Sequence, residues 1–185
     1  TRGCGDTDMP KKVADYHRDI LVEDLRALLD ALKLDKVRLV AHDWGAVQGW
    51  GFALKYPERV ERYIPMSVGH PTAYGSGGWR QKLKGWYVVM FQLPWFPEWL
   101  LKAGDWWFFR KWAAFPEEFP HLKPVLERPG RLTAGINYYR ANLDLILPRA
   151  RAKARVPVYG IFSTGDRFLT EGQMRNSAVY VEGTF

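Results

Sequence analysis

Cysteine is nearly absent from this sequence, and so are long apolar runs. Cys4 is the only cysteine among the 185 residues, so no internal disulfide can form and a reducing compartment, the cytoplasm, is expected. The longest apolar stretch, residues 86–101, contains Gln92, Glu98 and two prolines, which predicts no stable insertion into a membrane. The first residues also lack the apolar core that a signal peptide needs.

A strong excess of one charge is lacking too. The chain carries 27 Lys and Arg against 20 Asp and Glu, a net charge of +7. The basic residues are dispersed and form no stripe beside a nucleic-acid-binding motif, so nucleic acid is not an expected partner. An apolar content of 47% at this length predicts one ordinary globular domain.

The most distinctive segment is a short apolar strand that runs into a turn around Asp43. Residues 37–41 are apolar or β-branched, apart from Arg38, and a helical pattern starts directly after Gly45. A small residue, Ala41, stands two positions before the aspartate and Gly45 two positions after it, where larger side chains are expected to collide. This layout is typical of a nucleophile elbow, with aspartate where lipases have serine.

The aspartate narrows the chemistry that this turn could perform. A carboxylate is a poor nucleophile toward acyl carbon, but it opens alkyl centres that carry a strained or good leaving group, and an alkyl-enzyme ester results. Backbone N–H groups at the helix start, beginning with Trp44, would face developing negative charge. The alternative interpretation is a surface Asp43 that only caps the helix.

Apolar patterns around this turn predict a parallel α/β arrangement. Leucines between positions 21 and 32 share one face of a helix expected over about 13–32. The strand at 37–41, apolar on both faces, a crossover helix over about 46–55 and a strand over about 62–68 form a strand–helix–strand unit with parallel strands. A further strand is expected at 156–162. Between them lies a segment rich in Gly, Pro and aromatic residues, which holds seven of the nine tryptophans.

The segment Leu39–Ala46, with its run His42-Asp43-Trp44-Gly45, resembles the elbow of the α/β-hydrolase fold epoxide hydrolases. Haloalkane dehalogenases are similar in the same stretch, and the family usually has Gly where this chain has Ala41. The resemblance implies a parallel sheet with crossover helices and an inserted helical cap. We expect core at 1–69, the cap at 70–150, and a return to the core at 151–185.

The same resemblance assigns roles to three further residues. Asp166, in a Gly-Asp-x-x-Leu turn after the last strand, matches the acid that orients a histidine base, although an ordinary Asx turn is the alternative. Tyr139, in an Asn-aromatic-Tyr-Arg motif, and Tyr87, five residues before Gln92, match the pair of phenols that protonate the epoxide oxygen. The indole N–H of Trp44 would suit a halide ion and keeps a haloalkane dehalogenase as an alternative.

Two parts of the family's machinery have no counterpart in this sequence. There is no His-Gly-x-Pro loop for a second oxyanion donor, and no histidine follows Asp166. We therefore expect a fragment, incomplete at both ends and inactive alone, of an epoxide hydrolase that converts a small apolar epoxide to a vicinal diol. The family needs neither metal nor organic cofactor. A non-catalytic binding protein on the same fold is the remaining alternative, and the sequence does not reveal the oligomeric state.

Overall fold

A computed structural model describes residues 1–113 and 117–185, and its contacts divide the chain into two compact units. The elbow unit comprises Arg18–Trp86 and Asn142–Phe185. The cap unit comprises Thr1–His17 and Tyr87–Ala141. Residues 114–116 of the predicted cap lie outside the described residues. The first 17 residues thus cluster with the cap helices, whereas the limits 1–69, 70–150 and 151–185 stay predictions about domains.

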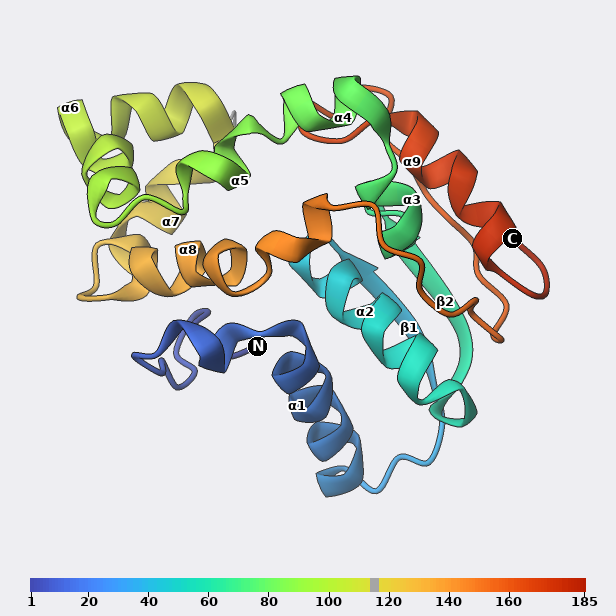
Figure 1. Cartoon of the computed structure of the whole chain (residues 1–185). Coiled ribbons are helices and arrows are strands. Elements are labelled where there is room, and N and C mark those ends of the chain that lie inside the picture. The colour runs from blue at the N-terminus through green and yellow to red at the C-terminus, as the bar shows by residue number, and fades with distance from the viewer. Residues whose placement is uncertain (114–116) are drawn as a thin grey trace. The chain divides into compact units, whose positions relative to one another are not determined.

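The elbow unit contains the predicted strand–helix–strand arrangement. Helix α1 (Arg18–Ala31) precedes β1 (Val37–His42), and α2 (Trp44–Lys55) connects it to η2 (Pro57–Arg59) and β2 (Val60–Met66). The two strands pair in parallel, with His42 opposite Met66, and α2 packs along both (Figure 1). These elements confirm the expected helix and two strands, and each observed end differs from the predicted end by two residues or fewer. The core of this unit is apolar and includes Trp50, Phe52, Val60, Tyr63 and Val158.

The segment at 156–162 lies where a strand was predicted, but it does not form a regular strand. The segment runs parallel to β2 only through isolated bridges, Tyr63 to Val158 and Met66 to Ile161. Proline has no backbone N–H to donate, and Pro65 of β2 and Pro157 of this segment each remove one possible ladder hydrogen bond. The chain still returns beside β2, on the edge opposite to β1, and carries Asp166 to the same end of the sheet.

The apolar character of β1 on both faces indicates a strand covered by helices on each side, and this expectation is wrong. Its residues alternate between half-buried and exposed, and Val40 is 57% exposed. Leu39 and Ala41 face the core beneath α2, whereas the other face of the strand has no covering helix in the described part of the chain. Among the described residues β1 pairs only with β2, so its second edge is open.

The helix expected over 13–32 is interrupted at His17. The structure has η1 (Val13–Tyr16), then His17 in an extended conformation, then α1. The backbone N–H of Arg18 donates to the side-chain oxygen of Asn142 at 2.9 Å. This distant amide satisfies a donor at the start of α1, and helix starts need such partners. The same elbow unit is completed by short elements: α3 (Pro71–Gly75), α4 (Gly78–Lys84), η3 (Leu143–Ile146), α9 (Glu171–Arg175) and η4 (Asn176–Tyr180).

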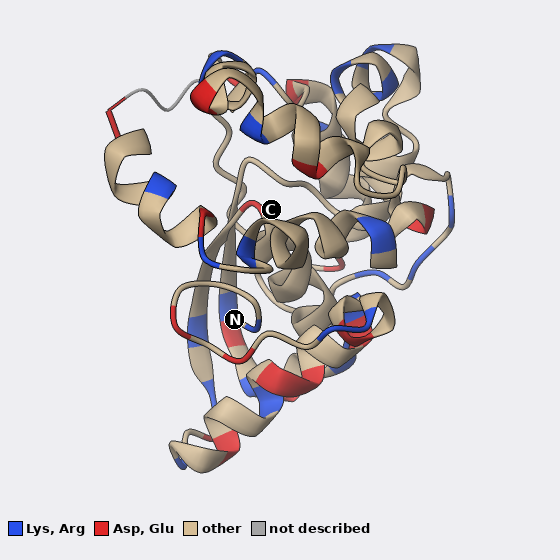
Figure 2. Cartoon of the chain, turned by 90° about the vertical axis from the view of Figure 1, so that its left-hand side faces the viewer, with Lys and Arg blue, Asp and Glu red and all other residues tan. Residues whose placement is uncertain are grey.

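The regular elements of the cap unit are helices, joined by turns and loops, among the residues that the structure describes. Besides η1 the unit contains α5 (Trp86–Met90) from Tyr87 onward, α6 (Phe96–Ala113), α7 (Phe119–Leu126) and α8 (Arg131–Ala141). Helix α6 has a kink, because residues 103–106 leave the helical conformation. In the described residues, no helix combines the length and the apolar character that crossing a membrane requires. Lys and Arg are spread over helices and loops and alternate with Asp and Glu (Figure 2).

Candidate active site

Asp43 occupies a sharp corner between β1 and α2. Its backbone has φ 50° and ψ −127°, a conformation that side chains other than glycine rarely adopt. The strand ends at His42 and the helix starts at Trp44, so this one residue makes the whole turn. Its carbonyl accepts the first helical hydrogen bonds, from Ala46 N–H at 2.9 Å and Val47 N–H at 3.1 Å. This is the backbone geometry expected of a nucleophile elbow.

The side chain of Asp43 does not act as an ordinary helix cap. It makes no capping hydrogen bond across the first turn of α2, which argues against the alternative interpretation from sequence. Surrounding protein raises the pKa of its carboxyl, while a backbone hydrogen bond from Trp44 and the charge of His42 act in the opposite direction. The residue nevertheless keeps solvent-accessible surface. The Asp43 carboxyl is therefore accessible from solvent, and the surrounding protein stabilises its charged form only in part.

The small residues around the elbow fit less tightly than the sequence suggested. A methyl group at Gly45 would meet the Ala41 methyl at 3.9 Å, which is an ordinary contact. The prediction that a larger side chain collides at this position is therefore wrong for an alanine in place of Gly45. The close approach of helix and strand comes one turn later. A methyl group at Gly49 would lie 2.6 Å from the phenol oxygen of Tyr63.

Asp166 lies in the same unit as Asp43. Its Oδ1 accepts hydrogen bonds from the backbone N–H groups of Phe168 and Leu169, both at 2.8 Å, so the Asx turn considered from sequence is present. Oδ2 accepts no hydrogen bond from the described residues. The charge of Asp166 also contributes to the raised pKa of Asp43. The structure thus brings the two predicted carboxylates near each other at the carboxyl end of the parallel strands, where ligands bind in open α/β sheets.

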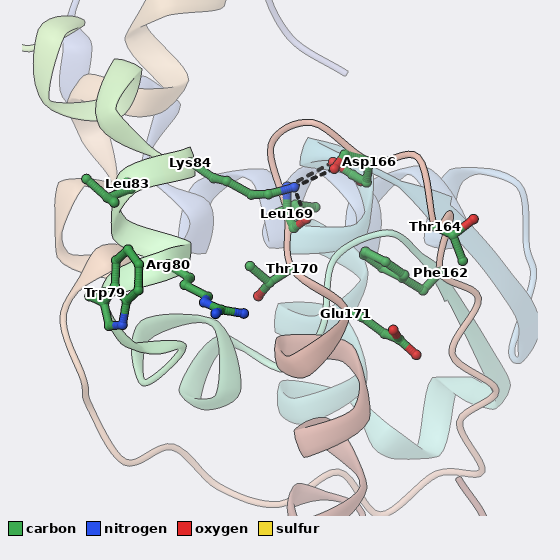
Figure 3. A pocket seen from close by; sticks show the side chains of 10 residues that line it. All are labelled: Trp79, Arg80, Leu83, Lys84, Phe162, Thr164, Asp166, Leu169, Thr170 and Glu171. Carbon is green, nitrogen blue, oxygen red and sulfur yellow. Dashed lines mark hydrogen bonds between the residues drawn. The ribbon is translucent and has the colours of Figure 1, made fainter.

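A pocket of about 420 Å³ opens beside Asp166 (Figure 3). Lys84 reaches across it from the end of α4 and donates to the backbone carbonyls of Asp166 at 2.5 Å and Leu169 at 3.0 Å. This lysine holds the Asp166 turn without pairing with its carboxylate. The remaining lining is Trp79, Arg80, Leu83, Phe162, Thr164, Thr170 and Glu171. Asp166 lines this pocket and Asp43 does not, so the pocket lies beside the predicted orienting acid and not at the predicted nucleophile.

Tyr74 of α3 is a site residue that the sequence did not reveal. Its ring packs on the apolar cluster of Ala46, Val68 and Leu169 that surrounds the elbow. Burial raises the pKa of its phenol to about 12, and the negative charge of Asp43 adds to the shift. A tyrosine near His70-Pro71 has no local pattern that points to Asp43, and only the fold brings the two side chains together.

The two predicted tyrosines meet in the cap unit. Tyr87 of α5 and Tyr139 of α8 have ring centroids 5.6 Å apart in an edge-to-face arrangement. The ring of Phe91 contacts both, at 5.7 Å from Tyr87 and 5.0 Å from Tyr139. Each predicted pair is therefore assembled within its own unit, the carboxylates in the elbow unit and the phenols in the cap unit. Trp44 opens α2, with its backbone N–H at the Asp43 carboxyl.

The described residues hold no group of three or more His, Cys, Asp or Glu side chains arranged to bind a metal ion. The groups that could act chemically are the two carboxylates and the backbone N–H groups at the start of α2 in the elbow unit, and, separately, the two phenols in the cap unit.

A family model, curated proteins and solved structures are similar to this chain. A family model described as alpha/beta hydrolase fold matches residues 1–120. Epoxide hydrolase 4 of Homo sapiens is 30% identical over 200 residues, which cover 100% of this chain and 55% of that protein. The crystal structure of an epoxide hydrolase from Vigna radiata matches with a TM-score of 0.74 and 27% identity, over 99% of this chain and 72% of that one.

A putative acyltransferase from Salmonella enterica matches with a TM-score of 0.83 but only 21% identity, over 100% of this chain and 67% of that one, which supports the fold alone. The chain spans about half the length of the curated relatives it matches, 55% and 54% of two of them.

Proposed function

This chain belongs to the alpha/beta hydrolase fold family, and we propose that the whole protein hydrolyses small apolar epoxides to vicinal diols, with Asp43 as the nucleophile. The observation that carries the proposal is the elbow itself. Asp43 has φ 50° between β1 and α2, and its carboxyl is not used as a helix cap. Strained backbone of this kind is retained where it aims a reactive group. The epoxide hydrolases among the similar proteins supply the reaction class.

In the first step, a carboxylate oxygen of Asp43 attacks one carbon of the epoxide ring. The bond between that carbon and the ring oxygen breaks, and an ester forms between Asp43 and the substrate. The ring oxygen takes a proton from Tyr87 or Tyr139 as its negative charge develops. A phenol of ordinary pKa near about 10 is protonated at neutral pH and can donate in this way.

In the second step, water attacks the carbonyl carbon of the ester and the diol leaves. The proton released as the Asp43 carboxylate reforms returns to the tyrosinate left by the first step. Attack by water gives a tetrahedral intermediate with a negative oxygen on the former carbonyl carbon. We propose that the backbone N–H of Trp44, at the start of α2, donates to this oxygen. The histidine that activates water in the family has no counterpart after Asp166 in this sequence, and we propose that the whole protein supplies it. Asp166 would then orient that histidine, and this chain alone would form the ester site without completing the cycle.

The tyrosine pair favours an epoxide over a haloalkane as the substrate. A halide leaves as a stable anion and needs no proton, whereas the oxygen of an opened epoxide does. Tyr87 and Tyr139, with ring centroids 5.6 Å apart, form a pair of phenols that a dehalogenase would not require.

The test is Asp43→Asn in the whole protein, assayed with an aromatic epoxide and, separately, with a matched haloalkane. Asparagine tolerates positive φ better than most residues, so the turn should survive. We expect epoxide turnover to fall at least about a thousandfold, because removing a nucleophile costs this much or more. Asp35→Asn, an exposed carboxylate just before β1, is the matched control and should retain activity. Undiminished turnover by Asp43→Asn, or halide release without epoxide opening by the unaltered protein, would overturn the proposal.

A further inference from the structure

The two phenols of the cap unit come from different helices, so something must hold α5 and α8 in register. Gln92, just after α5, provides one link. Its side-chain amide donates to the backbone carbonyl of Tyr139 at 3.2 Å and to that of Val88 at 2.9 Å. One amide therefore ties the end of the helix that carries Tyr87 to the residue that carries the other phenol.

Arg140 provides a second and more extensive link from α8. Its Nε donates to the carbonyl of Phe91 at 2.9 Å, and its Nη2 donates to the carbonyl of Leu93 at 2.8 Å. Both carbonyls lie in the turn that follows α5, so the guanidinium binds the segment through which the helix of Tyr87 leaves toward α6. Arg140 is also the residue next to Tyr139, so its guanidinium joins the helix that carries Tyr139 to the turn after the helix that carries Tyr87.

Glu98, in the first turn of α6, holds the guanidinium in place from the other side. Its two carboxylate oxygens accept from Nη1 at 2.8 Å and from Nη2 at 3.1 Å. The side chains of Arg140 and Glu98 are only 14% and 16% exposed. Burial opposes ionisation of Glu98, but the hydrogen bonds and charge of Arg140 prevail and the pKa of its carboxyl is lowered. The pair is therefore a charged, bidentate clamp.

The clamp of Arg140 and Glu98 also holds the residue whose ring lies between the two phenols, Phe91. Arg140 binds the carbonyl of Phe91, and the Phe91 ring contacts both Tyr87 and Tyr139. A change in the hydrogen bond to this carbonyl would be transmitted to both edge-to-face contacts. Lysine could not replace the arginine here, because its single ammonium cannot reach two carbonyls and both carboxylate oxygens at once.

From this geometry we propose that Arg140 is a positioning residue for epoxide opening, which aims the phenols of Tyr87 and Tyr139 at one oxygen. The inference rests on the proposed function. Proton donation requires hydrogen-bond reach, and a misplacement of about 1 Å can cost about a hundredfold in rate. Arg140 itself touches no substrate in this mechanism and contributes only through the two phenols.

The test separates the two chemical steps in the whole protein by stopped-flow single-turnover kinetics with an aromatic epoxide. In Arg140→Lys we expect ester formation to slow about tenfold to a hundredfold, as for displaced catalytic groups. Hydrolysis of the ester should change less than about twofold, because water attack does not use the phenols. Glu98→Gln keeps the size of the side chain and tests the clamp without altering Arg140. Glu98→Gln should also slow ester formation, by a smaller factor than Arg140→Lys does.

The matched control is Arg18→Lys. Arg18 makes a comparable bidentate pair with Asp144 in the elbow unit, at 2.6 and 2.9 Å, with side chains 16% and 24% exposed. This variant should lose thermal stability comparably and leave both rate constants unchanged. Equal slowing of both steps by Arg140→Lys and Glu98→Gln, or no slowing by either, would overturn the positioning role while the proposed function stood. Failure of the unaltered protein to form an ester with any epoxide would instead overturn the proposed function.

Discussion

Tyr63 of β2 donates its phenol hydrogen to the backbone carbonyl of Ala46, in the first turn of α2, at 2.7 Å. Both residues are fully buried, and the Tyr63 ring also meets Trp50 edge to face, with centroids 5.1 Å apart. The strand next to β1 therefore grips the start of the helix that follows Asp43. This contact helps to hold the strained turn, because the helix cannot shift along the strand without breaking a buried hydrogen bond.

Gly49→Ala should destabilise the protein by about 1 to 3 kcal/mol, the usual cost of overpacking a dense core. The added methyl group would lie 2.6 Å from the Tyr63 oxygen and 2.7 to 2.8 Å from its ring carbons. Urea unfolding measures the change. Gly45→Ala is the control, because its methyl group would meet only Ala41 at 3.9 Å, and it should be neutral or slightly stabilising. Equal effects of the two substitutions would show that α2 is not held tightly against Tyr63.

Tyr139→Phe and Tyr87→Phe should each slow ester formation from an epoxide by about a hundredfold, the lower range for losing a general acid. Phenylalanine keeps the edge-to-face contact of the two rings, whose centroids are 5.6 Å apart, and removes only the hydroxyl group. Single-turnover kinetics measures the effect. Tyr138→Phe is a suitable neighbour for comparison, since the Tyr138 phenol donates to the carbonyl of Arg2 at 2.6 Å and has a structural role. The assignment fails if Tyr138→Phe alone slows the reaction.

Tyr74 should ionise only in strongly alkaline solution, with a pKa of about 12, because its ring is buried and Asp43 is negatively charged. Asp43→Asn removes that charge and should lower the Tyr74 pKa, although burial will keep it above the usual value. The phenolate absorbance of the protein, compared with that of Tyr74→Phe, isolates this group. An unchanged titration in Asp43→Asn would mean that Tyr74 and Asp43 do not interact.

His70 should make the protein less stable as the pH falls below about 6.5. Its ring is fully buried, stacks on Tyr180 at 4.9 Å, and has Nε2 3.1 Å from the carbonyl of Ala152. Burial lowers its pKa to about 4, and the charge of Arg151 acts in the same direction. The unfolded chain therefore binds a proton at a higher pH than the folded protein does, and stability is lost from pH 6.5 down to about 4.

The loss should amount to at most about 3 kcal/mol, and His70→Gln should remove this part of the pH dependence. Urea unfolding at several pH values measures it. The exposed His121, replaced by Gln, is the control and should leave the profile unaltered. A profile of His70→Gln that parallels that of the unaltered protein would rule His70 out as its source.

The elements near the elbow could be predicted because their signals are local. The strand before Asp43 and the helix after Gly45 are visible as an apolar run and a helical pattern within 20 residues. The break at His17 could not be predicted, since it depends on Asn142, 124 positions away. The segment at 156–162 was predicted in the right place because it is apolar, but its irregular pairing was not, because one of the missing donors belongs to Pro65 of the neighbouring strand.

The site shows the same division between local and distant information. Asp43, Asp166 and the two tyrosines stand in short motifs, which is why sequence alone singles them out. Tyr74 and the clamp of Arg140 with Glu98 depend on pairings across 31 and 42 positions, respectively, and no local spacing indicates them. Residues that carry reactive groups were thus easier to find than residues that orient those groups.

The decisive experiment is a single turnover of the whole protein with an epoxide in water labelled with oxygen-18, followed by mass spectrometry of the peptide that contains Asp43. If Asp43 forms the ester, water attacks its carbonyl carbon, so one heavy oxygen enters the Asp43 carboxyl and the first diol released carries none. Heavy oxygen in the diol, with an unlabelled Asp43 peptide, would mean that water opens the epoxide directly and that Asp43 is not the nucleophile.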